Sequence, residues 1–261
     1  MNIVTCIKQV PDTAAKVELT PDGKGIQTAN LALVLNPYDE YAVEEALKLR
    51  EKFGGTVTLV TMGPKRADEA LRTGLAMGAD KGIHVCDEAL EDADSMATAR
   101  VLSAVLSTVP FDIVLCGKVS VDTNNGQVGQ MTAEFLGIPH VTAITKLELK
   151  DGRATAQKEV EGGKEVVETP LPALFTAEKD LNKPRYPSLP GIMKARQKEV
   201  KLLDLKALGN DPGLAGGTSP LVRLEGLSVP PKRAGGKVIQ GEPAEAVKTL
   251  ATALHQEAKV I

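Results

Sequence analysis

Over its first 139 residues the sequence alternates short apolar runs with amphipathic stretches, and the connections between them are short. The apolar runs are expected strands and lie at Asn2–Ile7, Thr56–Met62, Gly82–Val85 and Asp112–Cys116. The first expected helix begins at Pro37 and ends before Gly54. The others are expected at Ala67–Met77, Ser95–Ser107 and Gln127–Leu136. This alternation predicts an α/β fold in which helices cover both faces of a parallel sheet. Ligands of such folds bind at the carboxyl ends of the strands, where the strand order reverses.

The pattern changes after Pro139. Alternating stretches at 145–150 and 153–160 flank Asp151-Gly152 and predict a hairpin, and 165–168 and 173–176 are expected strands. Another hairpin is expected at 17–28. The run KPRYPSLPGIMKAR carries three prolines, so regular structure is not expected before about Ile192. We expect an α/β domain over 1–205 and an extended Gly- and Pro-rich arm over 206–261.

A helix is expected to resume at Pro243 within this arm, with Val247, Leu250, Ala251 and Leu254 on one face. This apolar face needs a partner surface. That surface would belong either to its own domain or to another chain.

Charge and composition exclude several classes of protein. The net charge is −3 and the pI is about 5.8, which argues against a nucleic-acid-binding domain. The start MNIVTCIKQV does not resemble a signal peptide, and we expect a cytoplasmic protein. Cys6, Cys86 and Cys116 are far apart and are expected to be reduced. The three histidines show no metal-ligand spacing with the cysteines, so no metal site is expected.

A polar loop follows the fourth apolar run, in the sequence VLCGKVSVDTNNGQVGQM. It can be a plain connection, or it can hold a phosphate with backbone N–H groups and the start of the next helix. The spacing matches neither the dinucleotide fingerprint nor the Walker A loop. Asp122 would repel a phosphate, so its expected role is to fix the loop through backbone N–H groups. The loop residues are Gly117, Lys118, Val119, Ser120, Val121, Asp122, Thr123, Asn124, Asn125, Gly126, Gln127 and Val128.

Three other segments are expected at the same edge of the sheet if the strand order is 3-2-1-4-5. They are Cys6–Gln9, Asn36–Asp39 with Asn36 as the helix N-cap, and Met62–Pro64. Together they could accommodate an adenine, a ribose and a phosphate. No nucleophile–base set and no paired carboxylates accompany them, which favours binding over catalysis.

The segments NPYDEYAVEEALKL, LAMGADKGIHV, CGKVSVDTNNGQVGQM, AQKEVEGGKEVVETPLPALFT and PRYPSLPGIMKAR closely resemble the small (beta) subunit of electron-transfer flavoprotein. The resemblance is collinear from Met1 to about Leu205. It implies a domain like those of the adenine nucleotide alpha hydrolases. It also implies a heterodimer in which an FAD-bearing large (alpha) subunit is wrapped by the C-terminal arm.

The resemblance further implies that this chain binds AMP as a structural nucleotide and has no catalytic residues of its own. The contacts carried over are Cys6, Asn36, Pro37, Tyr38, Asp39, Met62 and the loop Gly117–Val128. In bifurcating members the same place holds a second FAD, and the loop usually reads Gln-Val-Gly-Pro. Gln130 stands at that last position here, so AMP is favoured and a second FAD is the alternative.

Partner contacts are implied for a loop at 184–197. Leu189 resembles the leucine that docks into acyl-CoA dehydrogenases, with Pro190, Ile192, Met193 and Lys194 beside it. Tyr38 resembles an aromatic residue near the FAD of the large subunit, and Glu159 a residue that positions domains. The implied function is to carry electrons, as in fatty acid β-oxidation, to a quinone-linked oxidoreductase or another acceptor. A nucleotide-hydrolysing or adenylating enzyme of the same fold is the competing class. It would need a phosphate loop after the first strand, where this chain reads Cys6-Ile7-Lys8-Gln9.

Overall fold

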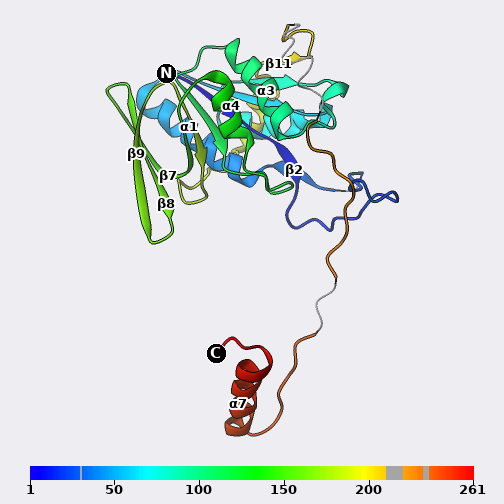
Figure 1. The fold of residues 1–261 in the computed structure, drawn as a ribbon. Helices are drawn as coiled ribbons and strands as arrows, with labels where there is room; N and C mark the ends of the chain where they lie inside the picture. Colours follow the sequence, from blue (N-terminus) through cyan, green and yellow to red (C-terminus); the bar gives the residue numbers. More distant parts are fainter. Residues whose placement is uncertain (30, 210–219, 232–234) are drawn as a thin grey trace.

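The computed structural model describes residues 1–29, 31–209, 220–231 and 235–261, and a nine-stranded sheet forms its centre (Figure 1). The strand order is β11-β5-β4-β1-β6-β10-β7-β8-β9. In chain order the strands are β1 (Asn2–Cys6), β4 (Thr56–Met62), β5 (Lys81–Val85), β6 (Ile113–Gly117), β7 (His140–Lys150), β8 (Arg153–Val160), β9 (Gly163–Pro170), β10 (Ala173–Ala177) and β11 (Val200–Leu203). Of the expected order 3-2-1-4-5, the part 3-2-1-4 is confirmed, and these four strands run parallel. The last place is wrong, because β10 lies between β6 and β7, the fifth expected strand.

Helices cover both faces of the sheet, as the alternation predicts. α1 (Pro37–Phe53), α2 (Asp68–Met77) and α5 (Leu189–Ala195) pack with one set of inward side chains, among them Ile3, Leu59 and Leu115. α3 (Ser95–Ser107) and α4 (Val128–Leu136) lie on the other face, with Val4 and Val114. Because neighbouring residues of a strand point to opposite faces, each strand supplies both cores. Short turns of helix lie at η1 (Lys65–Ala67) and η2 (Glu88–Leu90).

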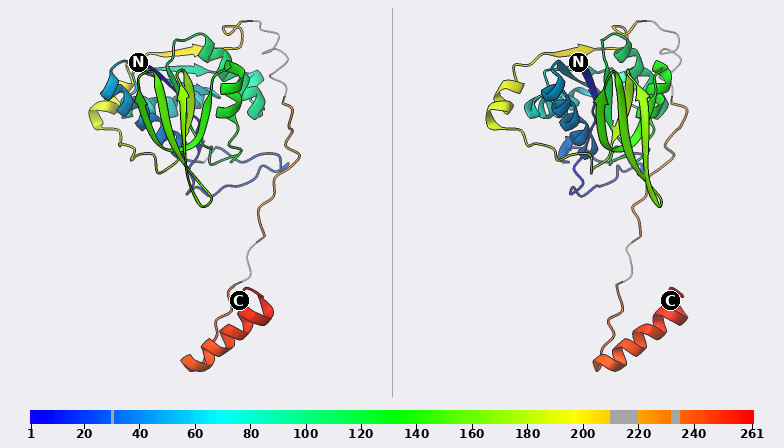
Figure 2. Two further views of the ribbon diagram at one scale, coloured as in Figure 1. Left: turned by 60° about the vertical axis from the view of Figure 1, so that its left-hand side comes forward. Right: turned by 90° about the vertical axis from the view of Figure 1, so that its left-hand side faces the viewer.

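β7 joins the parallel part of the sheet to its antiparallel part. Its start pairs with β10 in parallel, and its second half pairs with β8 in an antiparallel hairpin that turns at Asp151 and Gly152, as predicted. β9 then pairs along the whole of β8. Figure 2 shows these long strands standing beside the helical layers and projecting past them.

Several local predictions are wrong. The hairpin expected at 17–28 is reduced to one bridge between Leu19 and Ile26. A small sheet of β2 (Gln9–Pro11) and β3 (Leu33–Leu35) flanks it. α5 begins at Leu189 rather than near Ile192, because Pro190 suits the first turn of a helix and the Ser188 side chain accepts the Gly191 N–H.

Beyond the sheet, residues 220–231 of the arm are hydrogen-bonded to the body at two places. The Asp94 carboxylate accepts the N–H groups of Leu221 and Val222, and the Leu227 N–H donates to the Gly23 carbonyl. α7 (Pro243–Thr252), continued by the turn η3 (Ala253–Glu257), stands apart from the body, and none of its residues is buried (Figure 1). Folding of this helix onto its own domain is therefore not observed. The parts of the predicted arm at 210–219 and 232–234 lie outside the described residues.

No helix among the described residues has the length and apolar character that crossing a membrane requires. The division of the chain at 205/206 stays a prediction.

Candidate functional site

Asp39 joins the carboxyl ends of β1 and β6, where the strand order reverses. Its Oδ2 accepts the Lys8 N–H at 2.7 Å and its Oδ1 accepts the Gly117 N–H at 3.0 Å. The residue lies in the first turn of α1 and is 5% exposed. One carboxylate therefore fixes the helix start against the ends of both central strands.

The environment of Asp39 changes its ionisation. Burial raises the pKa of this carboxyl from 3.8 to about 7, although the N–H groups of Lys8 and Gly117 oppose the rise. Removing an ionised carboxylate from water is costly, and hydrogen bonds to the charged form recover part of that cost. The site therefore holds an acid that titrates near neutral pH.

Gly117 is required by this close approach. A Cβ at Gly117 would lie 2.4 Å from Asp39 Oδ1 and 2.7 Å from the Tyr38 Cβ, which is closer than real Cβ atoms come. Glycine lets the end of β6 pass under the first turn of α1.

Asn36 holds the polar loop instead of capping the helix. Its Nδ2 donates to the Val119 carbonyl at 3.0 Å, and its Oδ1 accepts the Val121 N–H at 3.2 Å. The side chain makes no cap bond, although the residue stands at the N-cap position of α1. This corrects the capping prediction, because the fully buried amide of Asn36 is already occupied by the loop.

Inside the loop, the chain turns sharply at Asn124 (φ 55°) and Gly126 (φ 60°). The Asn124 N–H donates to the Ser120 carbonyl at 2.9 Å, and the Ser120 and Thr123 hydroxyls lie 3.0 Å apart. Asn125 reaches the Ser95 hydroxyl at 3.2 Å. The loop is therefore a built structure with fixed internal bonds.

The end of this loop presents backbone donors at the start of α4. Within the described residues, no protein acceptor faces the N–H groups of Asn125, Gly126, Gln127 and Val128. α4 begins at Val128 with Gln127 at its N-cap, and Gln130 Nε2 bonds back to the Gly126 carbonyl at 2.7 Å. Free N–H groups and the helix dipole both favour an anion at this position.

Asp122 is tied to Lys8. Lys8 Nζ lies 2.6 Å from Asp122 Oδ2, and the Thr123 N–H donates to Asp122 Oδ1 at 2.8 Å. Burial acts to raise the pKa of Asp122, but Lys8 and the hydrogen bonds lower it overall. The acid thus has the loop-fixing contacts that the sequence suggests, and its charge is balanced by a lysine that the sequence did not single out.

A cavity of about 390 Å³ lies beside β7 and β8, and it is lined by Tyr38, Lys118 and Glu159 among other residues. Lys118 Nζ lies 5.7 Å from the centre of the Tyr38 ring and pairs with Glu178. The side chain of Glu159 is exposed and lies 3.7 Å from Lys164. The three side chains thus line one cavity, while the Lys118 carbonyl lies against Gly126 just before α4.

Three further residues lie at or next to the carboxyl ends of β4, β1 and β6. Met62 ends β4, the neighbour of β1, and is half-buried. Cys6 and Cys116 are register partners on β1 and β6, and both are buried. Pro37 occupies the first turn of α1.

The cysteines and the buried His84 lie in or directly after strands of the sheet. All three cysteines are free, as expected. His84 is buried, with Nε2 2.9 Å from the Gly63 carbonyl. In the part of the chain that the structure describes, no three His, Cys, Asp or Glu side chains gather where they could hold a metal ion.

A separate apolar surface lies on α5 and the residue stretch before it. Tyr186, Leu189 and Met193 are 94%, 74% and 68% exposed, and Ile192 is also exposed. Pro190 and Lys194 are exposed beside them. We call the stretch 184–197 the recognition segment. Its apolar surface lies apart from the strand-end loop, because α5 and α2 cover one face of the sheet, whereas the loop leads into α4 on the other face.

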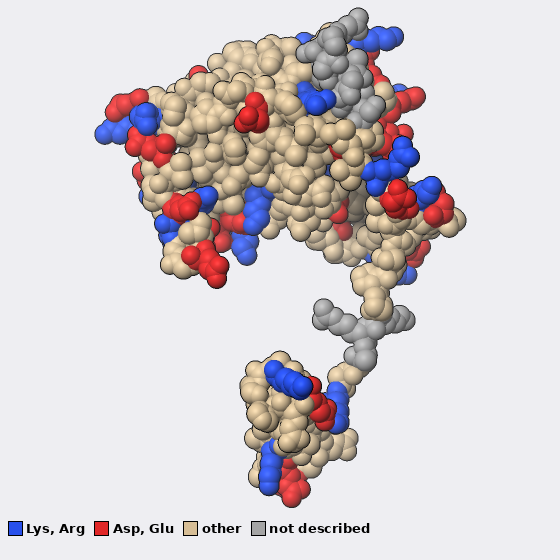
Figure 3. Space-filling model, in the orientation of Figure 1, with Lys and Arg blue, Asp and Glu red and all other residues tan. Residues whose placement is uncertain are grey.

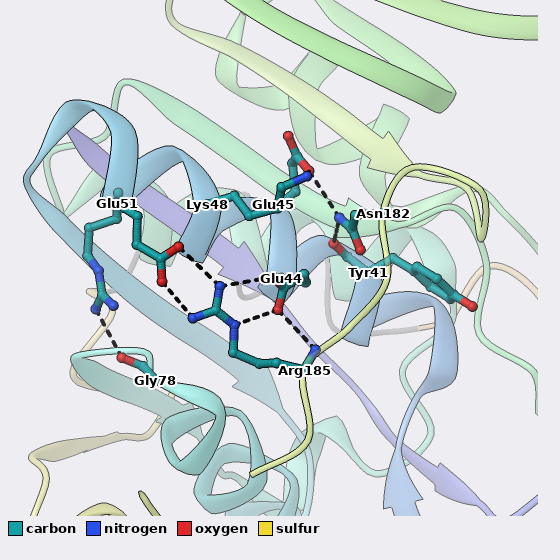
Figure 4. Close-up of polar contacts among 9 residues, drawn as sticks. Tyr41, Glu44, Glu45, Lys48, Glu51, Gly78, Asn182 and Arg185 are labelled. Carbon is teal, nitrogen blue, oxygen red and sulfur yellow. Dashed lines mark hydrogen bonds and ion pairs between the residues drawn. The ribbon is translucent and has the colours of Figure 1, made fainter. Parts of the chain in front are cut away.

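Sequence reasoning missed Arg185 and its acidic partners on α1. Arg185 binds the carboxylates of Glu44 and Glu51 (Figure 4). The signal was available only in part, as acidic residues spaced along the helix and an arginine between two prolines.

A structured loop where the order of a parallel sheet reverses is typical of Rossmann-like α/β proteins. Residues 25–208 match the model of the electron transfer flavoprotein domain. The chain is 44% identical over 262 residues to the electron transfer flavoprotein subunit beta of Bacillus subtilis (strain 168), covering all of both proteins. It is 41% identical to the corresponding subunit of Thermoanaerobacterium thermosaccharolyticum, covering 98% of each. The Dictyostelium discoideum subunit is 34% identical and is covered to 99%, with all of this chain aligned. The chain belongs to the family of electron transfer flavoprotein beta subunits.

Proposed function

We propose that this chain is the small subunit of a heterodimeric electron carrier and binds an alpha subunit through its arm. The observation that carries the proposal is the arm itself. It leaves the body after Leu227 and ends in α7, where Val247 and Leu250 are 65% and 48% exposed. An amphipathic helix that buries none of its residues is stabilised by packing on another surface. In Figure 3 the charged side chains of the body gather mostly at its margins, which leaves a wide uncharged face.

We further propose that the strand-end loop binds AMP. Support comes from the four N–H groups before and at the start of α4, and from the neutralisation of Asp122 by Lys8. The adenosine part would lie along Cys6, Asn36–Asp39 and Met62. The remaining contacts would come from the loop Gly117–Val128.

A second FAD in place of AMP is the alternative, and it would make the chain a bifurcating member of the family. Gln130 argues against it, because its side chain is bonded back to Gly126 and closes the turn. No catalytic side-chain set is proposed for this chain. The redox chemistry would come from the FAD of the alpha subunit, and Tyr38 and Glu159 would face that subunit from their common cavity.

The recognition segment is proposed to dock acyl-CoA dehydrogenases through Leu189, flanked by Pro190, Ile192, Met193 and Lys194. Its exposed apolar side chains support this role, since an isolated domain gains nothing from leaving them in water. A quinone-linked oxidoreductase is the proposed acceptor, and the cytoplasm the proposed location.

A nucleotide-hydrolysing or adenylating enzyme is disfavoured. Its phosphate loop would follow β1, where the structure has Lys8 and the short strand β2. The test of the proposal is to co-express the chain with an alpha subunit, purify the heterodimer and extract its cofactors. One AMP and one FAD per heterodimer are expected. Two FAD and no AMP would establish the bifurcating alternative, and a stable monomer that hydrolyses nucleotides would refute the electron carrier.

A further inference from the structure

The recognition segment is fastened at both ends to different helices. It connects β10 to β11, and its exposed apolar side chains lie between two groups of polar contacts. The upstream group holds Asn182 and Arg185 against α1. The downstream group holds Ala195 and Lys198 against α2.

The upstream contact is a guanidinium between two carboxylates (Figure 4). Arg185 Nε and Nη2 donate to Glu44 at 2.8 and 2.9 Å, and Nη1 and Nη2 donate to Glu51 at 2.6 and 3.2 Å. The backbone N–H of Arg185 also donates to Glu44, at 3.1 Å. Glu44 is 5% exposed, so its charge depends on this arginine for a partner. Both the side chain and the main chain of Arg185 are thereby fixed.

Asn182, three residues before Arg185 in the sequence, adds to the same attachment. Its Nδ2 donates to the Tyr41 carbonyl at 2.9 Å and to Glu45 Oε2 at 3.0 Å, and Lys48 lies 3.7 Å from Glu45. Glu44 and Glu45 lie three and four positions after Tyr41, and Glu51 lies seven after Glu44, so the contacted residues form one stripe along α1. The stripe guides the chain from Asn182 to Arg185 along α1.

The downstream contact joins basic side chains to main-chain carbonyls in both directions between α2 and residues 195–198. Arg72 Nη1 donates to the carbonyls of Ala195 and Lys198 at 2.9 and 3.0 Å. Lys198 Nζ donates to the Leu75 carbonyl at 3.0 Å and also to the Ala79 carbonyl. A Cβ at Gly191 would lie 2.5 Å from the Ala76 carbonyl, so α5 itself is pressed against the end of α2.

We infer that Arg185 is a positioning residue for partner docking, which holds the recognition segment in its docking conformation before a partner arrives. This inference rests on the proposed function of the segment. Between the attachments at Arg185 and Ala195 lie only residues 186–194, and Leu189 stands near the middle of this stretch. A segment that is already ordered loses less conformational entropy on binding, so affinity rises without any new contact.

Arginine is needed at this position for a geometric reason. Its planar fork can bind two carboxylates at once, whereas the ammonium of lysine is a point charge that cannot span both. Arg185→Lys should therefore loosen the segment while conserving charge. Arg185→Gln should loosen it more, because Glu44 and Glu51 are then left unpaired. Arg153→Gln is the matched control, since Arg153 forms an exposed pair with Glu168 on β8 and β9.

The first measurement is hydrogen exchange of the purified heterodimer without any dehydrogenase. Arg185→Gln should speed exchange of the amides of α5, such as Ile192, by about tenfold or more. Arg185→Lys should give a smaller change, and Arg153→Gln none. The amides of β1 should exchange as in the wild type in all three. Unchanged exchange of α5 in Arg185→Gln would overturn the inference without touching the proposed function.

The second measurement is the dehydrogenase assay with the heterodimer as electron acceptor. Arg185→Gln should raise the KM for the heterodimer about tenfold and leave kcat unchanged, because only docking is affected. In the Leu189→Ala background the same substitution should add little, since the side chain that Arg185 positions is gone. Full additivity would show that Arg185 acts on stability alone and would overturn the inference. If Leu189→Ala itself leaves KM unchanged, the docking role of the segment fails. Faster exchange of α5 would then still support its attachment by Arg185.

Discussion

Asp39 provides a sharp test of how the centre of the sheet is held together. The perturbation is Asp39→Asn, which conserves shape but removes the ionisable group. Asp39 is 5% exposed, and burial raises the pKa of its carboxyl from 3.8 to about 7. A buried acid with a raised pKa favours the protonated form. Its contribution to stability is therefore complete below pH 3.8 and is lost as the pH rises through 7.

The expected magnitude follows from this shift. Between pH 5.5 and 7 the wild type loses about 1.4 kcal/mol of stability per pH unit at this group, or about 2 kcal/mol in all. Asparagine cannot titrate, so Asp39→Asn removes this loss. At pH 5.5 the variant is expected to be slightly less stable than the wild type, because its amide offers one acceptor to the two N–H groups of Lys8 and Gly117. At pH 8 its stability relative to the wild type should have improved by about 2 kcal/mol.

The assay is native-state hydrogen exchange of the β1 and β6 amides in the heterodimer at pH 5.5 and pH 8, corrected for intrinsic rates. Asp87→Asn is the control. Asp87 also accepts two backbone N–H groups, from Ala89 and Leu205, but these bonds lower its pKa. Its effect should be the same at both pH values. If Asp39→Asn also costs the same at both, the two N–H groups keep Asp39 ionised throughout, and the argument from burial is refuted.

Three further changes test the proposed sites. Leu189→Ala should weaken dehydrogenase binding about tenfold. Full burial of a leucine side chain stabilises by roughly 1.5–3 kcal/mol, and because this one is 74% exposed, about three-quarters of that is gained on docking. An unchanged affinity in a titration with the dehydrogenase would contradict this. Gly126→Val should lower AMP content but spare FAD, because φ is +60° there and a β-branched residue strains the turn by about 1–3 kcal/mol; cofactor extraction decides. Asp94→Asn keeps the helix cap at Ala97 but turns an amide group toward the arm, so proteolysis of 220–231 should quicken while α3 stays protected; equal cleavage rates would show that this contact does not hold the arm.

Much of the fold could be predicted from the sequence because its signals are local. The strand Thr56–Met62 and the helix Ser95–Ser107 were predicted residue for residue, since an apolar run bounded by glycine and an amphipathic stretch need no distant information. The loop after β6 was located in the same way, through its Gly, Asn, Asp and Ser content. Membership of the family also followed from sequence segments alone.

Other features were decided by contacts between distant residues. β11 forms only because β5 offers an open edge, and the amide of Asn36 leaves its helix for a loop more than 80 positions away. Arg185 and Glu44 are 141 positions apart, and neither residue alone indicates a pair. Propensity and periodicity report what a segment can become in isolation. Which buried charge or amide finds which partner depends on the tertiary structure, because an unpaired polar group is costly only once packing has removed the water around it.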